Sequence, residues 1–122
     1  MSRQTFPVFV DQPGCIARNF NIDGSAVGAS AGTAGLDGRG KFLCTISKLN
    51  NVVTVNWVPS FGDVPYVFFQ PAAGQLDTIV EIVSETASQL VFQTVKATDN
   101  SAVNDADLHV HVDSYNTDNF VS

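Results

Sequence analysis

Six stretches of the chain, each six or seven residues long, either alternate hydrophobic and polar residues or are apolar throughout. A period of two is typical of a β-strand with one buried face, and a short apolar run is typical of a strand buried on both faces. The stretches are residues 41–47, 52–58, 65–70, 78–84, 89–95 and 107–113. The pattern therefore predicts an all-β protein.

The segments between these stretches are rich in turn-forming residues, and their lengths predict how the strands connect. Residues 48–51 and 85–88 are short enough for hairpins, whereas residues 59–65, 71–77 and 96–106 are longer loops. Short links join antiparallel neighbours. We therefore expect an antiparallel β-sandwich, jelly-roll-like, with about six to eight short strands and an extended N-terminal arm.

The N-terminal third carries weaker signals. Residues 5–10 and 15–22 are typical of short extended segments. Residues 23–40 hold six of the nine glycines, and their small side chains bury too little surface to nucleate a strand. The sequence thus predicts three parts: an arm with a Gly/Ala/Ser-rich connector (1–40), a sandwich (41–113) and a C-terminal tail (114–122).

Two of the predicted strands are apolar on both faces. Residues 65–70 set Tyr66 and Phe68 opposite Val67 and Phe69, and residues 78–84 alternate in the same way. The second apolar face needs a cover, which we expect to be another subunit, and the alternative is the chain's own N-terminal segment. The predicted subunit-interface residues are Tyr66, Phe68, Ile79 and Val83.

Composition narrows the classes of partner. The 122 residues carry a net charge of −6 and only 15% charged residues, which opposes the phosphate neutralisation that nucleic-acid binding requires. No stretch approaches the ~20 apolar residues of a membrane span, and the N-terminus lacks the pattern of a signal peptide. We therefore expect a soluble protein that binds neither nucleic acid nor membrane.

The two cysteines fit neither a redox motif nor a zinc motif. Cys15 and Cys44 are too far apart for a CxxC pattern, and Cys44 alternates with Phe42 and Ile46, so it is expected in the core. The favoured interpretation is that both thiols are free, and the alternative is a Cys15–Cys44 disulfide bond.

The stretch 107–113 contains the one arrangement of histidines and carboxylates in the sequence that is typical of metal ligands. His109 and His111, the chain's two histidines, share a face with Asp107 and Asp113, and two imidazoles at this spacing can share a metal. A closed site needs further ligands, so the polar outer face of a sheet is the favoured interpretation, and a metal held by His109 and His111 is the alternative. We predict no resident cofactor.

Motifs for catalysis are missing. The chain has no Gly-x-Ser-x-Gly element, and Glu81 and Glu85 do not form a convincing glycosidase pair. Aspartates near the C-terminus, such as Asp99 and Asp105, could bind Ca²⁺, but turn propensity explains the same residues without a metal and is the favoured interpretation. We therefore expect a protein that is not an enzyme.

Residues 52–113 resemble the small β-sandwich domains of tailed-bacteriophage virion proteins, and more distantly the H-type lectin sandwich. The resemblance lies in VTVNWVPSFGDVPYVFF, in the hairpin IVEIVSETASQLVFQTV, and in the polar loop that leads to DADLHVHVD. Such phage domains occur in head decorations, head fibres and tail fibres, commonly as trimers.

The resemblance implies a structural virion protein, namely a trimeric capsid decoration (cement) protein that binds the major capsid protein of the shell through its N-terminal segment. It would be assembled in the host cytoplasm and lie on the capsid surface. The alternative is a carbohydrate- or receptor-binding domain of a phage fibre, in which Trp57, Phe61 or Tyr115 stacks on a sugar.

Overall fold

The computed structural model describes residues 16–27, 32–75 and 77–114, which form eight β-strands and no helix. The strands are β1 (Ile16–Ile22), β2 (Thr33–Leu36), β3 (Phe42–Leu49), β4 (Val52–Trp57), β5 (Tyr66–Pro71), β6 (Thr78–Glu85), β7 (Gln89–Lys96) and β8 (Leu108–Ser114). All six predicted stretches correspond to strands, with bounds that differ by one or two residues. The predicted all-β class is confirmed.

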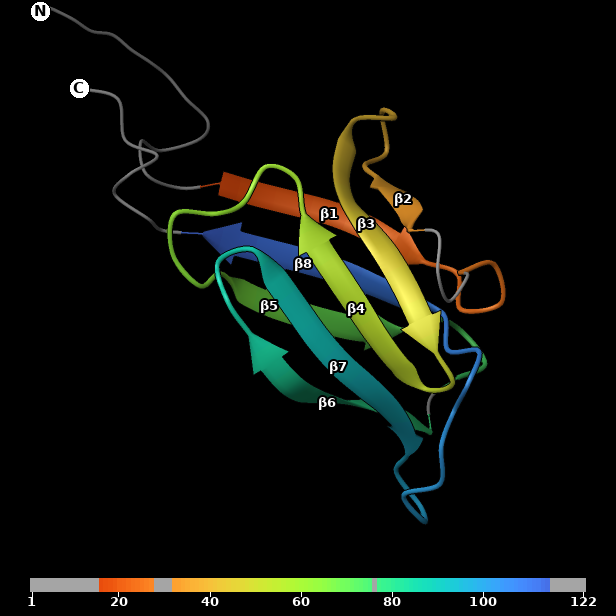
Figure 1. Cartoon of the computed structure of the whole chain (residues 1–122). Helices are drawn as coiled ribbons and strands as arrows, with labels where there is room; N and C mark the ends of the chain where they lie inside the picture. Colours follow the sequence, from red (N-terminus) through yellow and green to blue (C-terminus); the bar gives the residue numbers. More distant parts are fainter. Residues whose placement is uncertain (1–15, 28–31, 76, 115–122) are drawn as a thin grey trace, which may run out of the picture.

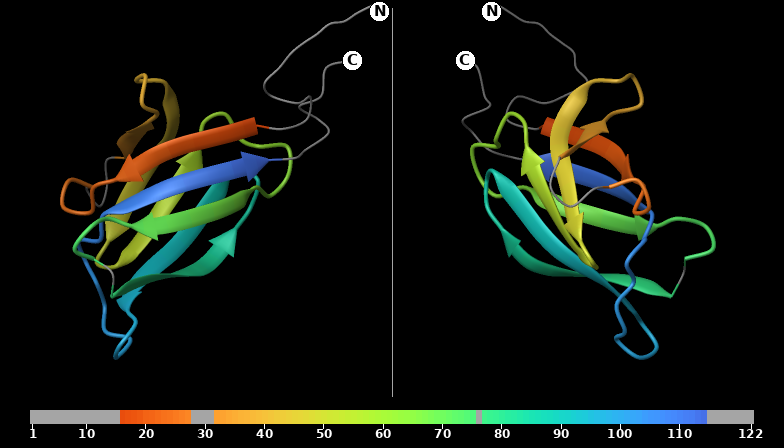
Figure 2. Two further views of the ribbon diagram at one scale, coloured as in Figure 1. Left: turned by 180° about the vertical axis from the view of Figure 1, so that it is seen from behind. Right: turned by 45° about the vertical axis from the view of Figure 1, so that its right-hand side comes forward.

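The strands form two antiparallel sheets that pack face to face (Figures 1 and 2). One sheet has the order β1-β8-β5 and the other the order β2-β3-β4-β7-β6. β8 is the central strand of the smaller sheet, and it pairs Ile16 with Ser114 on one side and Tyr66 with Asp113 on the other. The architecture is therefore the predicted antiparallel β-sandwich.

Alternate residues of both sheets point between the layers and form the core. Phe92, Val55 and Val112 are fully buried there, and the Phe69 ring lies 4.8 Å from the Phe92 ring across the layers. At one end of the core Trp57 makes edge-to-face contacts with Phe20 and Phe61. These aromatic pairs add stability beyond the area that they bury.

Both predicted hairpins are present. β3 and β4 are joined at Asn50, which has a φ of 56°, a left-handed conformation that asparagine tolerates better than most residues. β6 and β7 are joined through Thr86, whose Oγ1 accepts a hydrogen bond of 3.0 Å from the backbone N–H of Gln89. Side-chain oxygens of this kind stabilise turns by replacing a missing backbone acceptor.

The expectation that residues 23–40 contain no strand was wrong, because β2 lies within them and pairs with β3. A Cβ atom added to Gly35 of β2 would lie 2.3 Å from Cys44 Sγ, so a small residue is what allows this close pairing. β1 and β2 both precede residue 41, so the predicted boundary between arm and sandwich does not match the sheets. The predicted segment 5–10 lies outside the described residues.

Each lateral side of the sandwich brings together an edge strand of the smaller sheet and an edge strand of the larger sheet. The edge strands β1 and β2 lie beside each other on one side, and the edge strands β5 and β6 lie beside each other on the other (Figure 1). We call the side formed by Tyr66–Pro71 and Thr78–Glu85 the β5–β6 side. An edge strand leaves backbone N–H and C=O groups without a sheet partner, which makes this side a place where another chain can add.

Candidate functional site

Outward-facing side chains of β1, β8 and β5 form three rows across the outer face of the smaller sheet. Each row follows from the register of the strands, because paired residues of antiparallel strands point to the same face. The rows are Asn21-His109-Gln70, Asn19-His111-Phe68 and Ala17-Asp113-Tyr66. The intervening residues of these strands, such as Phe20 and Val110, are buried in the core.

The two imidazoles of this face are held by neighbouring strands. His109 Nδ1 lies 2.7 Å from Asn21 Oδ1, and His111 Nδ1 is hydrogen-bonded to Asn19 Oδ1. His111 Nε2 lies 2.8 Å from Asp113 Oδ1. Both ring nitrogens of His111 are therefore engaged, whereas His109 is held through Nδ1.

The structure places His109 and His111 on the same face, as predicted, without a third metal ligand. Within the described ranges, no three His, Cys, Asp or Glu side chains form a group that could hold a metal ion. Asp107 does not join the histidines, because its carboxylate accepts hydrogen bonds from Gly24 N (2.9 Å) and Gln75 Nε2 (3.1 Å). A metal at the two histidines stays a prediction.

A cleft of about 620 Å³ lies over this face, between the rows and the turn that follows β2. Its lining combines amides, imidazoles, a carboxylate and an aromatic ring: Asn19, Asn21, Gln70, His109, His111, Asp37 and Phe68 are among the lining residues. The Phe68 ring lies 6.0 Å from the His111 ring. Amide and imidazole groups beside an aromatic face suit a polyhydroxylated ligand, because they match its hydroxyl groups and its C–H surface.

The four predicted interface residues lie on the two strands of the β5–β6 side. The exposed fractions are 63% for Tyr66 and 56% for Phe68 on β5, and 40% for Ile79 and 59% for Val83 on β6. Val67 and Phe69, which alternate with the β5 pair, pack against the core. None of the four is covered by the part of the chain that the structure describes.

β6 adds further apolar surface to this side. Val80 packs against the core, while Ile82 remains 47% exposed although it pairs with the buried Phe92. The register shifts between Ile82 and Ser84, which is a β-bulge. A bulge bends an edge strand, and here it disturbs the alternation so that Ile82 and its neighbour Val83 are both exposed.

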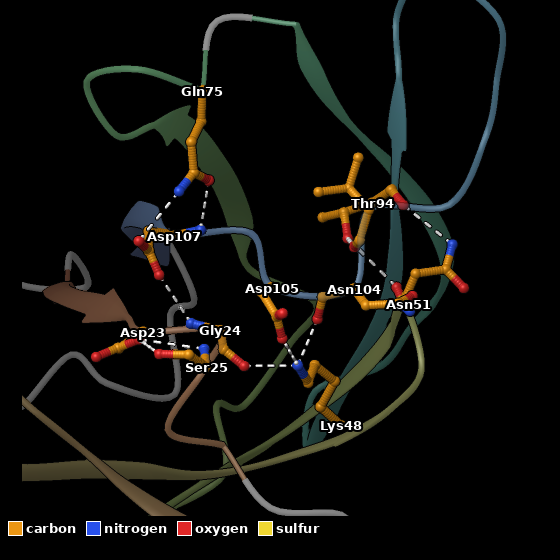
Figure 3. A network of polar contacts seen from close by, with 11 residues as sticks. Asp23, Gly24, Ser25, Lys48, Asn51, Gln75, Thr94, Asn104, Asp105 and Asp107 are labelled. Atoms are coloured by element: carbon orange, nitrogen blue, oxygen red, sulfur yellow. Dashed lines mark hydrogen bonds and ion pairs between the residues drawn. The ribbon is translucent and has the colours of Figure 1, made fainter.

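Acidic residues at one end of the sandwich hold loops together (Figure 3). Lys48 Nζ lies 3.0 Å from Asp105 Oδ1 and 2.5 Å from Gly24 O, and it also donates to Asn104 O. Asp107 links the same turn at Gly24 to Gln75. These contacts explain the positions of Asp105 and Asp107 without a bound Ca²⁺ ion.

Two aromatic residues proposed for sugar stacking are buried. Trp57 is 3% exposed and Phe61 is 4% exposed, so neither can present a ring face to a glycan, and that expectation was wrong. Trp57 alternates with Val55 and Val53 toward the core, which the strand pattern already indicated. Tyr115 lies outside the described residues.

The burial of Arg18 was not predicted from the sequence. Arg18 occupies an inward position of β1, alternating with exposed Ala17 and Asn19, and it is 8% exposed. Burial lowers the pKa of its guanidinium below the ordinary value. The signal was present, because period two places position 18 in the same register as the core residues Phe20 and Ile22.

Cys44 is a free thiol, fully buried in the core as predicted. Burial raises the pKa of this thiol to about 12, and the nearby Arg18 opposes the shift only in part. A thiol in this state is a poor nucleophile, because the thiolate is the reactive form. Cys15, the other cysteine, lies outside the described residues.

Comparisons with protein families, with curated proteins and with solved structures found no match for this chain. No helix capable of crossing a membrane occurs in the described residues.

Proposed function

We propose that this protein is a non-enzymatic structural component of a tailed-phage particle, a trimeric capsid decoration protein. The observation that supports the proposal is the β5–β6 side, where two edge strands carry exposed Tyr66, Phe68, Ile79 and Val83. Exposed apolar side chains on strands whose edges are unpaired are typical of a surface that another chain covers.

Association through this side has a favourable energetic basis. Burial of the exposed apolar side chains of this side contributes about 25 cal/mol per Å², before the entropy of association is subtracted. Pairing of the edge strands would satisfy backbone groups at the same time. Three copies around a threefold axis would each bury their β5–β6 side against neighbouring copies.

Attachment to the shell is assigned to residues 1–15. The resemblance to phage decoration proteins implies an N-terminal segment that binds the major capsid protein, and β1 already occupies Ile16–Ile22 as a sheet strand. A shell-binding segment that detaches β1 from the sheet would have to break seven pairs of residues with β8. The proposal therefore restricts shell binding to the residues before β1.

Co-sedimentation with shells assembled from the major capsid protein of the phage that encodes the chain tests this function. The full chain is expected to sediment with the shells, and a chain that begins at Ile16 is expected to stay in the supernatant while keeping its β-sheet circular dichroism. A full chain that remains in the supernatant at every concentration would contradict a decoration role.

A second candidate function is glycan binding in the cleft over the smaller sheet. The observation that favours it is the exposed Phe68 ring beside the Asn21-His109 and Asn19-His111 pairs, all of which line the cleft. This site replaces the buried Trp57 and Phe61 with a ring that is 56% exposed.

A glycan array with three variants separates the two functions. If the protein binds glycans, Asn21→Ala and His109→Ala abolish the array signal. Leu49→Ala is the control and leaves the signal intact, because Leu49 is exposed and lies outside the cleft. If the protein is a capsid decoration protein that binds no glycan, the wild-type chain gives no signal on the array. Phe68 does not discriminate, because it belongs to the cleft and to the β5–β6 side.

A further inference from the structure

A second groove, of about 600 Å³, lies beside the start of β1, between the β2–β3 turn and the segment that follows β4. Its lining includes Arg18, Asp37, Arg39, Lys41, Phe42 and Pro59. It shares Asn19, Asp37 and Gly38 with the cleft over the smaller sheet, but none of that cleft's histidines or aromatic rings.

Arg18 lies at the inner wall of this groove with few partners. Its guanidinium carbon lies 4.0 Å above the centre of the Phe61 ring, and NH1 donates to Leu43 O at 3.3 Å. A guanidinium has five N–H donors, and this is its one hydrogen bond to another described residue. The ion pairs among the described residues are Lys48–Asp105 and His111–Asp113, so no described carboxylate pairs with Arg18.

Burying a cation without a neighbouring anion raises the free energy of the folded state, so the environment of Arg18 indicates a missing anionic partner. Taking a charge out of water is unfavourable even after the protein relaxes, and an ion pair or several hydrogen bonds normally offset the lost hydration free energy. The cation–π contact with Phe61 offsets only part of this desolvation cost. An oxyanion that enters the groove would supply both the missing charge and the missing acceptors.

The surroundings of Arg18 are cationic although the chain as a whole is acidic. Arg39 and Lys41 lie on the same groove, so three of the five described cationic side chains gather here in a chain with a net charge of −6. The groove also contains Asp37, whose Oδ1 accepts the backbone N–H groups of Arg39 (2.8 Å) and Lys41 (2.9 Å). These bonds hold the turn in shape and lower the pKa of Asp37.

We propose that this groove is an oxyanion-binding site, with Arg18 as its inner ligand and Arg39 and Lys41 as ligands at its rim. The ligand presents a carboxylate or a phosphate group, since both match the planar donor pattern of a guanidinium. This site is independent of the proposed trimer, because the β5–β6 side lies across the sandwich from β1 and β2.

Titration of the full chain with inorganic phosphate, and separately with succinate, tests the site. Both titrations are followed by the ¹⁵Nε–Hε resonance of Arg18 at constant ionic strength. Saturable movement of that resonance with either anion supports the site, and the anion that binds more tightly identifies the ligand as phosphoryl or carboxylate. Absence of saturable movement with both anions overturns the proposal.

Matched variants distinguish a built site from a general effect of salt. Arg39→Gln with Lys41→Gln changes only exposed rim residues, and we expect the dissociation constant to rise at least tenfold. Lys96→Gln removes an exposed lysine outside the groove and is expected to leave the constant within twofold. If the rim variant binds as tightly as the wild type, the site is not the one proposed here.

Discussion

At the scale of single residues, close approach between β2 and β3 depends on the absence of a side chain at position 35. A Cβ atom there would meet Cys44 Sγ at 2.3 Å and Ile46 Cδ1 at 3.3 Å, both in the buried core. The sulfur atom has no room to move away, because core side chains are packed at near-crystalline density.

We predict that Gly35→Ala lowers the free energy of unfolding by roughly 1–3 kcal/mol, the usual effect of overpacking a core. Chemical denaturation measures the change. Gly38→Ala is the matched control, since an added Cβ there meets nothing within 4 Å. Combining Gly35→Ala with Cys44→Ala should recover part of the loss, and strict additivity of the two changes would contradict the proposed clash.

The buried thiol predicts how stability responds to alkaline pH. Folding raises the pKa of Cys44 from 9.0 to about 12, so between these values the unfolded chain releases a proton that the folded chain retains. Stability attributable to Cys44 is complete below pH 9 and falls as pH rises toward 12. At the middle of this window the loss amounts to about 2 kcal/mol.

The measurement compares unfolding free energies of Cys15→Ala and Cys15→Ala/Cys44→Ala chains from pH 7 to pH 11. Only the chain that retains Cys44 should show the additional alkaline loss, because tyrosines and lysines are common to both. Parallel pH profiles would show that Cys44 ionises as easily in the folded state as in the unfolded state.

Alternation identified most residue environments from the sequence, and it failed where a polar residue occupied an inward position. It placed Cys44 inside and the histidines of β8 on the outer face, as observed. It did not identify the buried Arg18, because a charged residue is expected at the surface unless a partner is known. Trp57 shows the opposite error, since its register in β4 indicates burial, whereas the sugar-binding role expected of it requires exposure.

At the scale of elements, the loops at one end of the sandwich depend on Lys48 at the end of the β3–β4 hairpin. Its side chain is 13% exposed, whereas that of its ion-pair partner Asp105 is 72% exposed. An ion pair with one exposed partner contributes little, so the hydrogen bonds from Lys48 to the carbonyl oxygens of Gly24 and Asn104 should dominate.

Two substitutions separate these contributions. Lys48→Met should destabilise the fold by about 1–3 kcal/mol, because it leaves two carbonyl groups without their charged donor. Asp105→Asn removes the ion pair alone and should cost less than about 1 kcal/mol. Thermal and chemical denaturation give both values, and an equal effect of the two changes would show that the ion pair is the main contact.

Strand prediction succeeded wherever apolar residues were frequent and failed where they were sparse. The six stretches from residue 41 onward are dense in branched and aromatic side chains, which favour a pleated sheet. β2 has the sequence TAGL, so its place in the sheet comes from pairing with β3 rather than from burial of large side chains. Local composition does not show such tertiary pairing.

At the scale of the whole molecule, each lateral side of the sandwich is formed by one edge strand from each sheet. β1 and β2 lie together with one strand in each sheet, and β5 and β6 form the opposite side with exposed apolar residues on both edge strands (Figure 2). The two-sided apolar pattern of these strands was visible in the sequence. Their common location at one side was not, because it depends on the pairing of β5 with β8 and of β6 with β7.

Association through this side predicts a specific response to charge. Phe68→Lys with Val83→Lys places a cation on each edge strand and should dissociate the assembly, since an unpaired charge in an interface core costs several kcal/mol. Leu49→Lys is the matched control, because Leu49 is 68% exposed and lies at the β3–β4 hairpin, away from β5 and β6.

Sedimentation equilibrium of the wild-type chain, the double variant and the Leu49→Lys control tests the central claim most directly. A trimer of the 13.0 kDa chain has a mass of about 39 kDa, which we predict for the wild type and for the control. The double variant should sediment as a single 13.0 kDa chain with an unchanged β-sheet spectrum. A wild-type chain that stays at 13.0 kDa at every concentration would contradict the proposed assembly.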